Sequence, residues 1–259
     1  MKNLRYRDRM EKWNKDNPLR VFEAFAGYGS QSLALRRVKA RINAQFGYSN
    51  GLNPDIEGFD FEVVGISEID PYALKAYESI HGNCPNYGDI SKIDWKQVPD
   101  FDLFTYSFPC TDISNAGLQK GLSEGSGTRS GLLWECRKAI EAKMPKYLLM
   151  ENVKALLSEK FKPEFYKWRD YLTNLGYESY TKIINATECG VPQNRERVFM
   201  VSILGEHKPF HFPEPIVLEK RLKDVLENDV DRKYFLSDKA IVGFLKHNEN
   251  HEAKGTGFI

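Results

Sequence analysis

A cysteine that follows a proline at the end of an apolar run is the first candidate for chemistry. Residues 102–106 are apolar, β-branched and aromatic, which predicts a buried strand, and Phe108-Pro109-Cys110 comes directly after it. In open α/β sheets ligands bind at the carboxyl ends of the strands, so Cys110 is a candidate nucleophile. Taken alone, an unpaired cysteine is more often a small core residue. The residues that the rest of the chain places beside it therefore decide between the two interpretations.

Charged residues at two other strand ends suit the same edge of a sheet. An apolar strand at residues 147–150 leads into Glu151 and Asn152, which puts a second acid at a strand's carboxyl end. Arg195 and Arg197 stand in a Gly-Pro turn before the last predicted strand, over residues that begin at Val198. Arginine carries a rigid, permanent charge, so this turn can aim fixed cations at a site. A surface ion-pair loop is the alternative for either arginine taken alone.

A glycine turn near the start of the chain predicts a nucleotide-binding βαβ unit. A strand over residues 19–25 is followed by Gly27 and Gly29 and then by a helical run over residues 31–38. These glycines allow a tight turn and let a ligand approach the helix N-terminus, which a Cβ would obstruct. Ser32 replaces the third glycine of the dinucleotide fingerprint, which weakens a pyrophosphate-binding interpretation.

An acid after the second predicted strand suits a nucleoside. Residues 61–67 predict the strand, Glu68 and Asp70 follow it, and a helix is expected from Pro71 to about Ile80. In nucleotide-binding sheets such a carboxylate accepts hydrogen bonds from the ribose hydroxyls. We expect Glu68 to take that role and Asp70 to cap the helix.

These elements must alternate along the chain, which predicts an α/β fold with a doubly wound, mostly parallel sheet. Further helices are expected over residues 132–143 and 161–175, the second with an aromatic face that belongs to the core, and a strand over residues 177–185. The expected organisation is a charged N-terminal helix at 1–18, a sheet domain at 19–212 with a surface insertion at 39–60, and the start of a smaller C-terminal region at 213–259.

Composition and charge restrict the class of protein. Of 259 residues, 41% are hydrophobic and 28% are charged, which is typical of a globular chain with one large domain. The net charge of +1 means that a phosphate-binding surface would need local clusters of Lys and Arg. The sequence lacks a membrane-length apolar stretch and a signal-peptide core, so we expect a cytoplasmic protein. Four widely separated cysteines without a Cys-x-x-Cys pair predict no metal site.

The order and spacing of these motifs resemble the DNA cytosine-5 methyltransferase family in its bacterial or phage form. Single motifs of this kind are common, but the ordered set is highly specific, and it spans residues 19–203. The matching residues are Phe25-Ala26-Gly27-x-Gly29, Glu68-Ile69-Asp70, Gly88-Asp89-Ile90, Phe108-Pro109-Cys110 with Ser114, Glu151-Asn152-Val153 and Gln193-x-Arg195-x-Arg197.

The resemblance implies a covalent mechanism on cytosine. C5 of the base is a weak nucleophile, so a thiolate must first add to C6 and turn the ring into an enamine, and the resemblance assigns this role to Cys110. It assigns protonation of N3 to Glu151. Arg195 and Arg197 would hold the carbonyl oxygen of the base and the acid in register, with Asn152 as a support.

The implied cofactor is S-adenosyl-L-methionine, with S-adenosyl-L-homocysteine as product, bound by a Rossmann-like methyltransferase domain. Phe25 would lie beside the adenine, Glu68 on the ribose, Ile69 against the ring and Asp89 at the exocyclic amine. This cofactor has no pyrophosphate, which accounts for the missing third glycine. The positions assigned to it are Phe25, Ala26, Gly27, Gly29, Ser30, Glu68, Ile69, Asp89, Ile90 and Pro109.

The implied substrate is double-stranded DNA, whose target base must be flipped out of the stack. The glycine-rich segment at residues 117–131 has the composition of a mobile lid, and in the family the loop from Asn115 closes over the flipped base. A flexible connector is the alternative interpretation. The positions assigned to this loop and its support are Ser114, Asn115, Gly117, Gly131 and Asn152.

Departures from the family pattern leave alternatives open. Thr111 stands where the family has glutamine, and Ser30 stands at the second of its paired glycines. The family's Arg-x-x-Thr and Gly-Asn-Ser-Val segments are absent from the sequence, so we expect a truncated chain or the N-terminal part of a split enzyme that needs a second polypeptide. A tRNA cytosine-5 methyltransferase shares the cysteine and Glu-Asn-Val logic. A nicotinamide-dependent oxidoreductase would explain only the glycine turn and Glu68.

Overall fold

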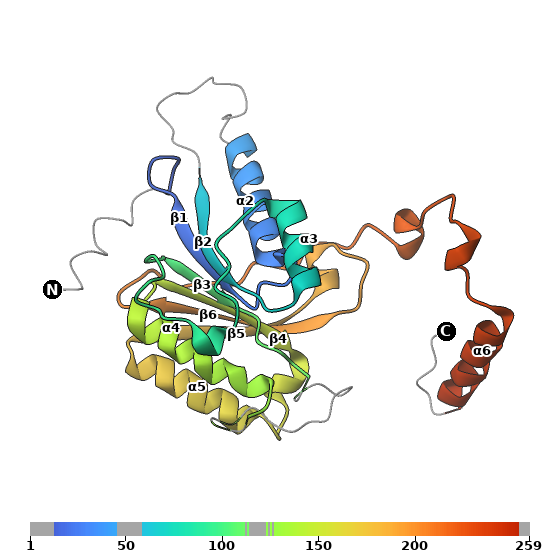
Figure 1. Ribbon diagram of the computed structural model, residues 1–259. Coiled ribbons are helices and arrows are strands. Elements are labelled where there is room, and N and C mark those ends of the chain that lie inside the picture. The colour runs from blue at the N-terminus through green and yellow to red at the C-terminus, as the bar shows by residue number, and fades with distance from the viewer. Residues whose placement is uncertain are drawn as a thin grey trace.

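One mixed sheet of six strands organises the part of the chain that the structure describes. The structure is a computed structural model, and it describes residues 13–45, 59–111, 113, 123, 125 and 127–253. The strands are β1 (Leu19–Ala24), β2 (Phe61–Ser67), β3 (Leu103–Tyr106), β4 (Tyr147–Val153), β5 (Tyr177–Asn185) and β6 (Glu196–Leu204), in the spatial order β2-β1-β3-β4-β6-β5 (Figure 1).

Strand direction agrees with the predicted fold class. The strands β2, β1, β3 and β4 run parallel, whereas β6 runs antiparallel to both β4 and β5. Strands covered on both faces are continuous apolar runs, and β1 shows this pattern with Val21 and Phe22 both fully buried. The expected α/β fold with a mostly parallel sheet is confirmed, with β6 as the reversed strand.

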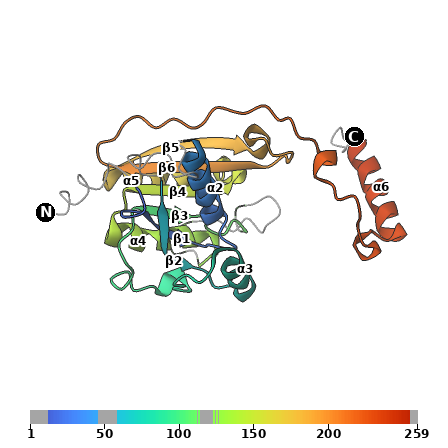
Figure 2. The same ribbon diagram turned by 90° about the horizontal axis from the view of Figure 1, so that it is seen from above.

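Helices cover both faces of the sheet, as a doubly wound fold requires. α2 (Ser30–Gln45) and α3 (Pro71–His81) lie on one face, and α4 (Cys136–Lys143) and α5 (Lys162–Asn174) lie on the other (Figure 2). The site-bearing loops therefore emerge from a sheet that is held rigid on both sides.

Local sequence determines where α3 begins. The Asp70 carboxylate accepts hydrogen bonds from the backbone N–H groups of Tyr72 and Ala73, and Pro71 occupies the first turn, where its missing N–H costs nothing. The expected capping role of Asp70 is confirmed.

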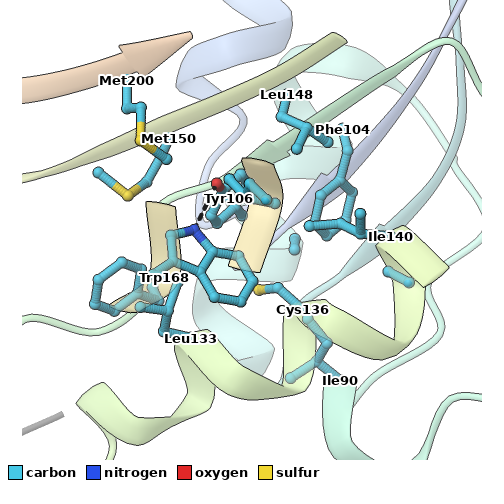
Figure 3. Close-up of a cluster of buried hydrophobic side chains, with 14 of the residues drawn as sticks. Ile90, Phe104, Tyr106, Leu133, Cys136, Ile140, Leu148, Met150, Trp168 and Met200 are labelled. Atoms are coloured by element: carbon cyan, nitrogen blue, oxygen red, sulfur yellow. Dashed lines mark hydrogen bonds between the residues drawn. The ribbon is translucent and has the colours of Figure 1, made fainter. Parts of the chain in front are cut away.

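The main core lies between the sheet, α4 and α5, and it is built largely from aromatic side chains. Phe22, Phe104, Tyr106 and Trp168 are fully buried there. The indole N–H of Trp168 donates to the Tyr106 hydroxyl at 3.2 Å, so this aromatic pair is buried with its polar atoms satisfied (Figure 3). The prediction that the aromatic face of α5 belongs to the core is confirmed.

Two helices differ from the expected bounds by more than one residue. α2 continues to Gln45 because residues 39–45 are mostly good helix formers and contain neither glycine nor proline. The segment expected as one helix over residues 132–143 is a 3₁₀ helix at Ser130–Glu135 that leads into α4. Residues 13–18 are not helical. The rest of the expected N-terminal helix lies outside the described residues, as does most of the expected insertion.

The chain after β6 follows the β5–β6 side of the sheet and then leaves it. The Ile216 N–H donates to the Glu188 carbonyl at 2.9 Å, which ties this segment to the loop between β5 and β6. Beyond that contact lie two short 3₁₀ turns and α6 (Asp238–Glu252), drawn apart from the sheet in Figures 1 and 2. Several apolar side chains here are exposed, including Phe235 and Phe244. Across the described ranges, each helix falls short of the length and apolarity of a bilayer span.

Candidate active site

Strand order brings the predicted site residues to one edge of the sheet. β1, β2, β3 and β4 are parallel, so the segments after them emerge at their common carboxyl edge. These segments begin at Phe25, Glu68 and Ser107, and Glu151 is among the last three residues of β4. β6 runs the other way, so its first residues lie at this same edge, with Arg197 opposite Val153.

An ion pair joins the predicted acid to one predicted cation. The Nε atom of Arg197 lies 3.1 Å from Oε1 of Glu151, and their side chains are 22% and 27% exposed. A half-buried charge pair of this kind is screened less than a surface pair, and it holds the carboxyl in one orientation. Arg195 is exposed, and its backbone N–H donates to Oδ1 of Asn185 at 3.0 Å.

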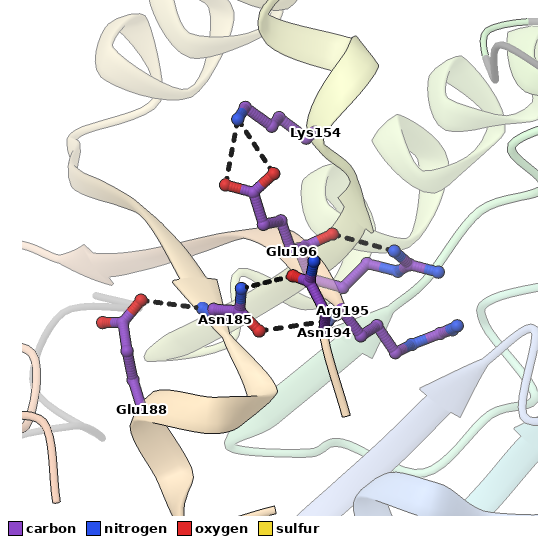
Figure 4. Close-up of polar contacts among 7 residues, drawn as sticks. Lys154, Asn185, Glu188, Asn194, Arg195 and Glu196 are labelled. Carbon is purple, nitrogen blue, oxygen red and sulfur yellow. Dashed lines mark hydrogen bonds and ion pairs between the residues drawn. The ribbon is translucent and has the colours of Figure 1, made fainter. Parts of the chain in front are cut away.

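The loop that carries both arginines is anchored by Asn185, a residue outside the predicted motifs. The Asn185 side-chain amide donates to Oδ1 of Asn194 at 2.8 Å, and Glu188 accepts from the Asn185 backbone N–H at 3.0 Å (Figure 4). At the start of β6, Lys154 contacts Glu196 at 2.9 Å. The Asn-x-x-Glu spacing is that of a capping box, so a signal for this anchor was present in the sequence.

The loop bearing the candidate nucleophile is held by two buried polar side chains. Asn152, only 3% exposed, donates from its side-chain amide to the Phe108 carbonyl at 2.9 Å. The Ser130 hydroxyl, fully buried, donates to the Pro109 carbonyl at 2.8 Å. Cys110 is partly buried and packs against the main core. The sequence predicts Asn152 as a support but not Ser130, because a serine after a glycine-rich run carries no distinguishing signal.

The acid after β2 holds the glycine turn after β1. Oε2 of Glu68 accepts from the Gly27 N–H at 2.8 Å, and Oε1 accepts from the N–H groups of Ile69 and Asp70 at 2.8 and 2.7 Å. Asn86, which the sequence does not predict as a support, holds the Glu68 backbone. Its Oδ1 accepts from the Glu68 N–H at 3.1 Å, and its Nδ2 donates to the Glu68 carbonyl at 3.0 Å. Glu68 is thus oriented before any ligand arrives, and three of its four lone pairs are used, which leaves one on Oε2 for a hydroxyl donor.

The glycine turn leaves open space on one side and is packed on the other. Phe25 and Gly27 both have φ of 56°, a left-handed conformation that is unusual for a phenylalanine. A Cβ added to Gly27 or to Gly88 would meet no atom within 4 Å, whereas one added to Gly29 would collide with α3. Ile69, which follows Glu68 in the chain, is 75% exposed. A turn, a carboxylate and an apolar surface around open space fit an adenosyl group.

The remaining predicted cofactor positions have varied surroundings. Asp89 caps a short 3₁₀ helix (Ile90–Lys92) and accepts from the Ser91 hydroxyl and N–H, and these hydrogen bonds hold the pKa of Asp89 below its usual value. Ile90 is buried in the main core, and Ala26 is also buried, whereas Ser30 is exposed.

Part of the predicted substrate loop lies outside the described residues, namely Ser114, Asn115 and Gly117. Gly131 is described, and its N–H donates to the Thr128 hydroxyl at 3.0 Å. Within the described ranges, no group of three or more His, Cys, Asp and Glu residues could hold a metal ion.

The sheet and its two helical layers form a Rossmann-like α/β fold. Solved structures with this fold include S. pombe Dnmt2 methyltransferase, with a TM-score of 0.64 and 21% identity over 89% of this chain and 66% of that one. Entamoeba histolytica methyltransferase EhMeth is similar, with a TM-score of 0.64 and 21% identity over 88% of this chain and 66% of that one.

Sequence comparison identifies the family of the chain. Residues 19–259 match the model of the C-5 cytosine-specific DNA methylase family. The type II methyltransferase M2.ScrFI of Lactococcus lactis subsp. cremoris is 42% identical, over 86% of this chain and 71% of that protein. The orphan methyltransferase M.SssI of Spiroplasma monobiae is 34% identical, over 91% of this chain and 70% of that protein. The chain belongs to the C-5 cytosine-specific DNA methylase family.

Proposed function

We propose that the protein methylates C5 of cytosine in double-stranded DNA and that Cys110 is its nucleophile. The family supports the reaction, and the place of Cys110 after β3 supports its role. Addition of the Cys110 thiolate to C6 makes C5 an enamine carbon that can attack a methyl group. Loss of the C5 proton then expels the thiolate and restores the aromatic ring.

The observation that carries this proposal is the ion pair between Arg197 and Glu151 at the edge where Cys110 also lies. Addition at C6 builds negative charge on the ring, and protonation of N3 by Glu151 relieves it. Arg197, 3.1 Å from Glu151, holds this carboxyl in place. Arg195, exposed at the same edge, would bind the carbonyl oxygen of the base.

The methyl donor of this proposal is S-adenosyl-L-methionine, which supplies an electrophilic methyl group when bound. The glycine turn leaves room for it, since a Cβ at Gly27 would meet nothing within 4 Å. Glu68 would accept from a ribose hydroxyl at its remaining lone pair, and Ile69 offers an exposed apolar surface for the adenine. Asp89 is expected to bind the exocyclic amine.

The DNA part of the proposal rests on the family and on the chemistry of the target. A stacked cytosine is inaccessible to Cys110, so the base must be flipped out of the duplex. Segments that include Ser114, Asn115 and Gly117 are expected to close over it. The relatives named above are a type II and an orphan methyltransferase, which favours a role in DNA modification.

A transfer assay with labelled cofactor and duplex DNA tests this function. We expect label in 5-methylcytosine and a covalent adduct with DNA that contains 5-fluorocytosine, both lost in Cys110→Ser. Cys189→Ser is the matched control, because Cys189 is exposed and lies in the β5–β6 loop. Label in adenine, or in tRNA with none in DNA, would contradict the proposal.

A second candidate is that methyl transfer needs a further polypeptide. The chain spans 71% and 70% of the two relatives named above, and less of some others, such as 59% of the type II methyltransferase M.SsoII of Shigella sonnei. In this case the chain binds S-adenosylhomocysteine but transfers no methyl group alone. Calorimetric binding measured beside turnover separates the two cases.

A further inference from the structure

A carboxyl group is buried behind the glycine turn, on the sheet face that α2 and α3 cover. Glu23 of β1 is fully buried, and Oε2 accepts from the Ser32 hydroxyl of α2 at 2.9 Å. The Ser32 hydroxyl lies 3.2 Å from the hydroxyl of Tyr77 in α3, and both residues are 1% exposed. Burying a carboxyl group costs free energy unless it is hydrogen-bonded, so the presence of Glu23 between three elements calls for an account.

The same group of residues reaches the glycine turn from behind. The Tyr77 ring packs against the His81 ring with centroids 4.6 Å apart. Nε2 of His81 donates to the Tyr28 carbonyl at 3.0 Å. A Cβ added to Gly29 would lie 2.4 Å from Nε2 of His81 and 2.7 Å from the Tyr77 ring, so the turn rests directly on this pair.

The contacts therefore brace both ends of the turn. Glu23 stands two residues before Phe25, whose φ is 56°, and Ser32 stands three residues after Gly29, whose φ is 79°. The Glu23–Ser32 hydrogen bond ties the strand before the turn to the helix after it. Backbone in such conformations persists when its surroundings over-determine it.

We infer that Glu23, Ser32, Tyr77 and His81 form a positioning network that holds the glycine turn in its cofactor-binding conformation. This inference rests on the proposed function, because the turn must bind S-adenosylmethionine. These side chains act through the turn rather than on the reacting atoms. Their loss raises the Kd and KM for the cofactor while kcat at saturating cofactor and DNA stays close to that of the unchanged protein.

The protonation of the network suits this role. Desolvation lowers the pKa of His81, which favours the neutral ring that donates from Nε2. Burial and the nearby Glu23 raise the pKa of Tyr77, so its hydroxyl keeps its proton at neutral pH.

Single-hydroxyl variants of the full chain test the network with little change of shape. Ser32→Ala and Tyr77→Phe are each expected to raise the Kd for S-adenosylhomocysteine about fivefold, the equivalent of one net hydrogen bond. Their combined effect is expected to be less than additive, because both remove the same connection. Glu23→Gln keeps an acceptor for Ser32 and is expected to bind better than Glu23→Leu.

Thr105→Val is the matched control. Thr105 lies beside Glu23 on β3, is 1% exposed, and its buried hydroxyl has no hydrogen-bond partner within the described residues. We expect this variant to keep the original Kd. Folded Ser32→Ala and Tyr77→Phe proteins with unchanged Kd would overturn the inference, as would an equal rise in Thr105→Val. Failure of the unchanged protein to bind S-adenosylhomocysteine would instead contradict the proposed function.

Discussion

Arg197 and Glu151 form an ion pair, with Nε and Oε1 3.1 Å apart, although they stand 46 positions apart in the chain, with α5 and β5 between them. The pair exists because β6 inserts between β4 and β5 in the reverse direction, which places Arg197 opposite Val153. A parallel β6 would begin at the other edge of the sheet, and the acid would lack this partner.

Removing this cation should slow methyl transfer. Arg197→Ala deletes a charge-assisted contact worth about 1.5–3 kcal/mol, so we expect kcat to fall about ten- to hundredfold. Steady-state assays with saturating cofactor measure this effect. Lys154→Ala is the control, since it breaks an exposed ion pair with Glu196 and should leave kcat nearly unchanged. If Arg197→Ala kept the original kcat, a role for this ion pair in methyl transfer would be contradicted.

Changing the acid after β2 should weaken cofactor binding. In the native protein the Glu68 carboxylate accepts hydrogen bonds from the N–H groups of Gly27, Ile69 and Asp70. In Glu68→Gln an amide NH₂ group replaces one carboxylate oxygen, so it faces either the Gly27 N–H or the other two N–H groups, donor against donor. We expect the Kd for S-adenosylhomocysteine, measured by calorimetry, to rise about tenfold or more. Asp70→Asn is the control, because asparagine caps a helix as well as aspartate does. Equal effects of the two changes would contradict a specific role for Glu68.

Truncating the supports of the nucleophile loop should lower stability. Asn152→Ala leaves the Phe108 carbonyl without its side-chain donor, and Ser130→Ala does the same to Pro109. Each is expected to lower the free energy of unfolding by about 1–3 kcal/mol in urea denaturation. Thr173→Ala, which removes an exposed hydroxyl on α5, should change it by less than about 0.5 kcal/mol. Stability unchanged in both loop variants would show that this loop is held by other contacts.

Stability should depend on pH through the buried acid of β1. Burial raises the pKa of Glu23 above its ordinary 4.5, although hydrogen bonds from Ser32 and Tyr77 oppose the shift. The folded state then binds the proton more tightly than the unfolded state does. The penalty of ionising this buried carboxyl is therefore absent below pH 4.5, and it lowers the free energy of unfolding as pH rises through the folded pKa. Glu23→Gln should gain stability relative to the unchanged protein as pH rises. Urea denaturation from pH 4.5 upward measures the difference in free energy of unfolding between the two proteins. A difference that shrinks as pH rises would contradict this prediction.

Much of the fold could be predicted because its signals are local. The apolar runs of β2 and β3 and the Asp70-Pro71 start of α3 are each specified within a few residues. The bounds of α2 were less predictable, because its last turns have good helix propensity but no apolar periodicity that marks an end. The supports Ser130 and Asn86 could not be predicted, since a serine or an asparagine can bond to many carbonyl and N–H groups, and only the packed chain selects one.

The sequence by itself determined which chemical groups lie near the ends of the strands, because strand ends follow from the local hydrophobic pattern. Cys110, Glu151 and Glu68 are recognised in this way as candidates for the site. Tertiary structure alone decided which of these groups meet. The reversed β6 brings Arg197 to Glu151, and the packing of α2 and α3 brings Ser32 and Tyr77 to Glu23. Such contacts depend on strand order and helix packing, which long-range burial determines and no short stretch of residues encodes.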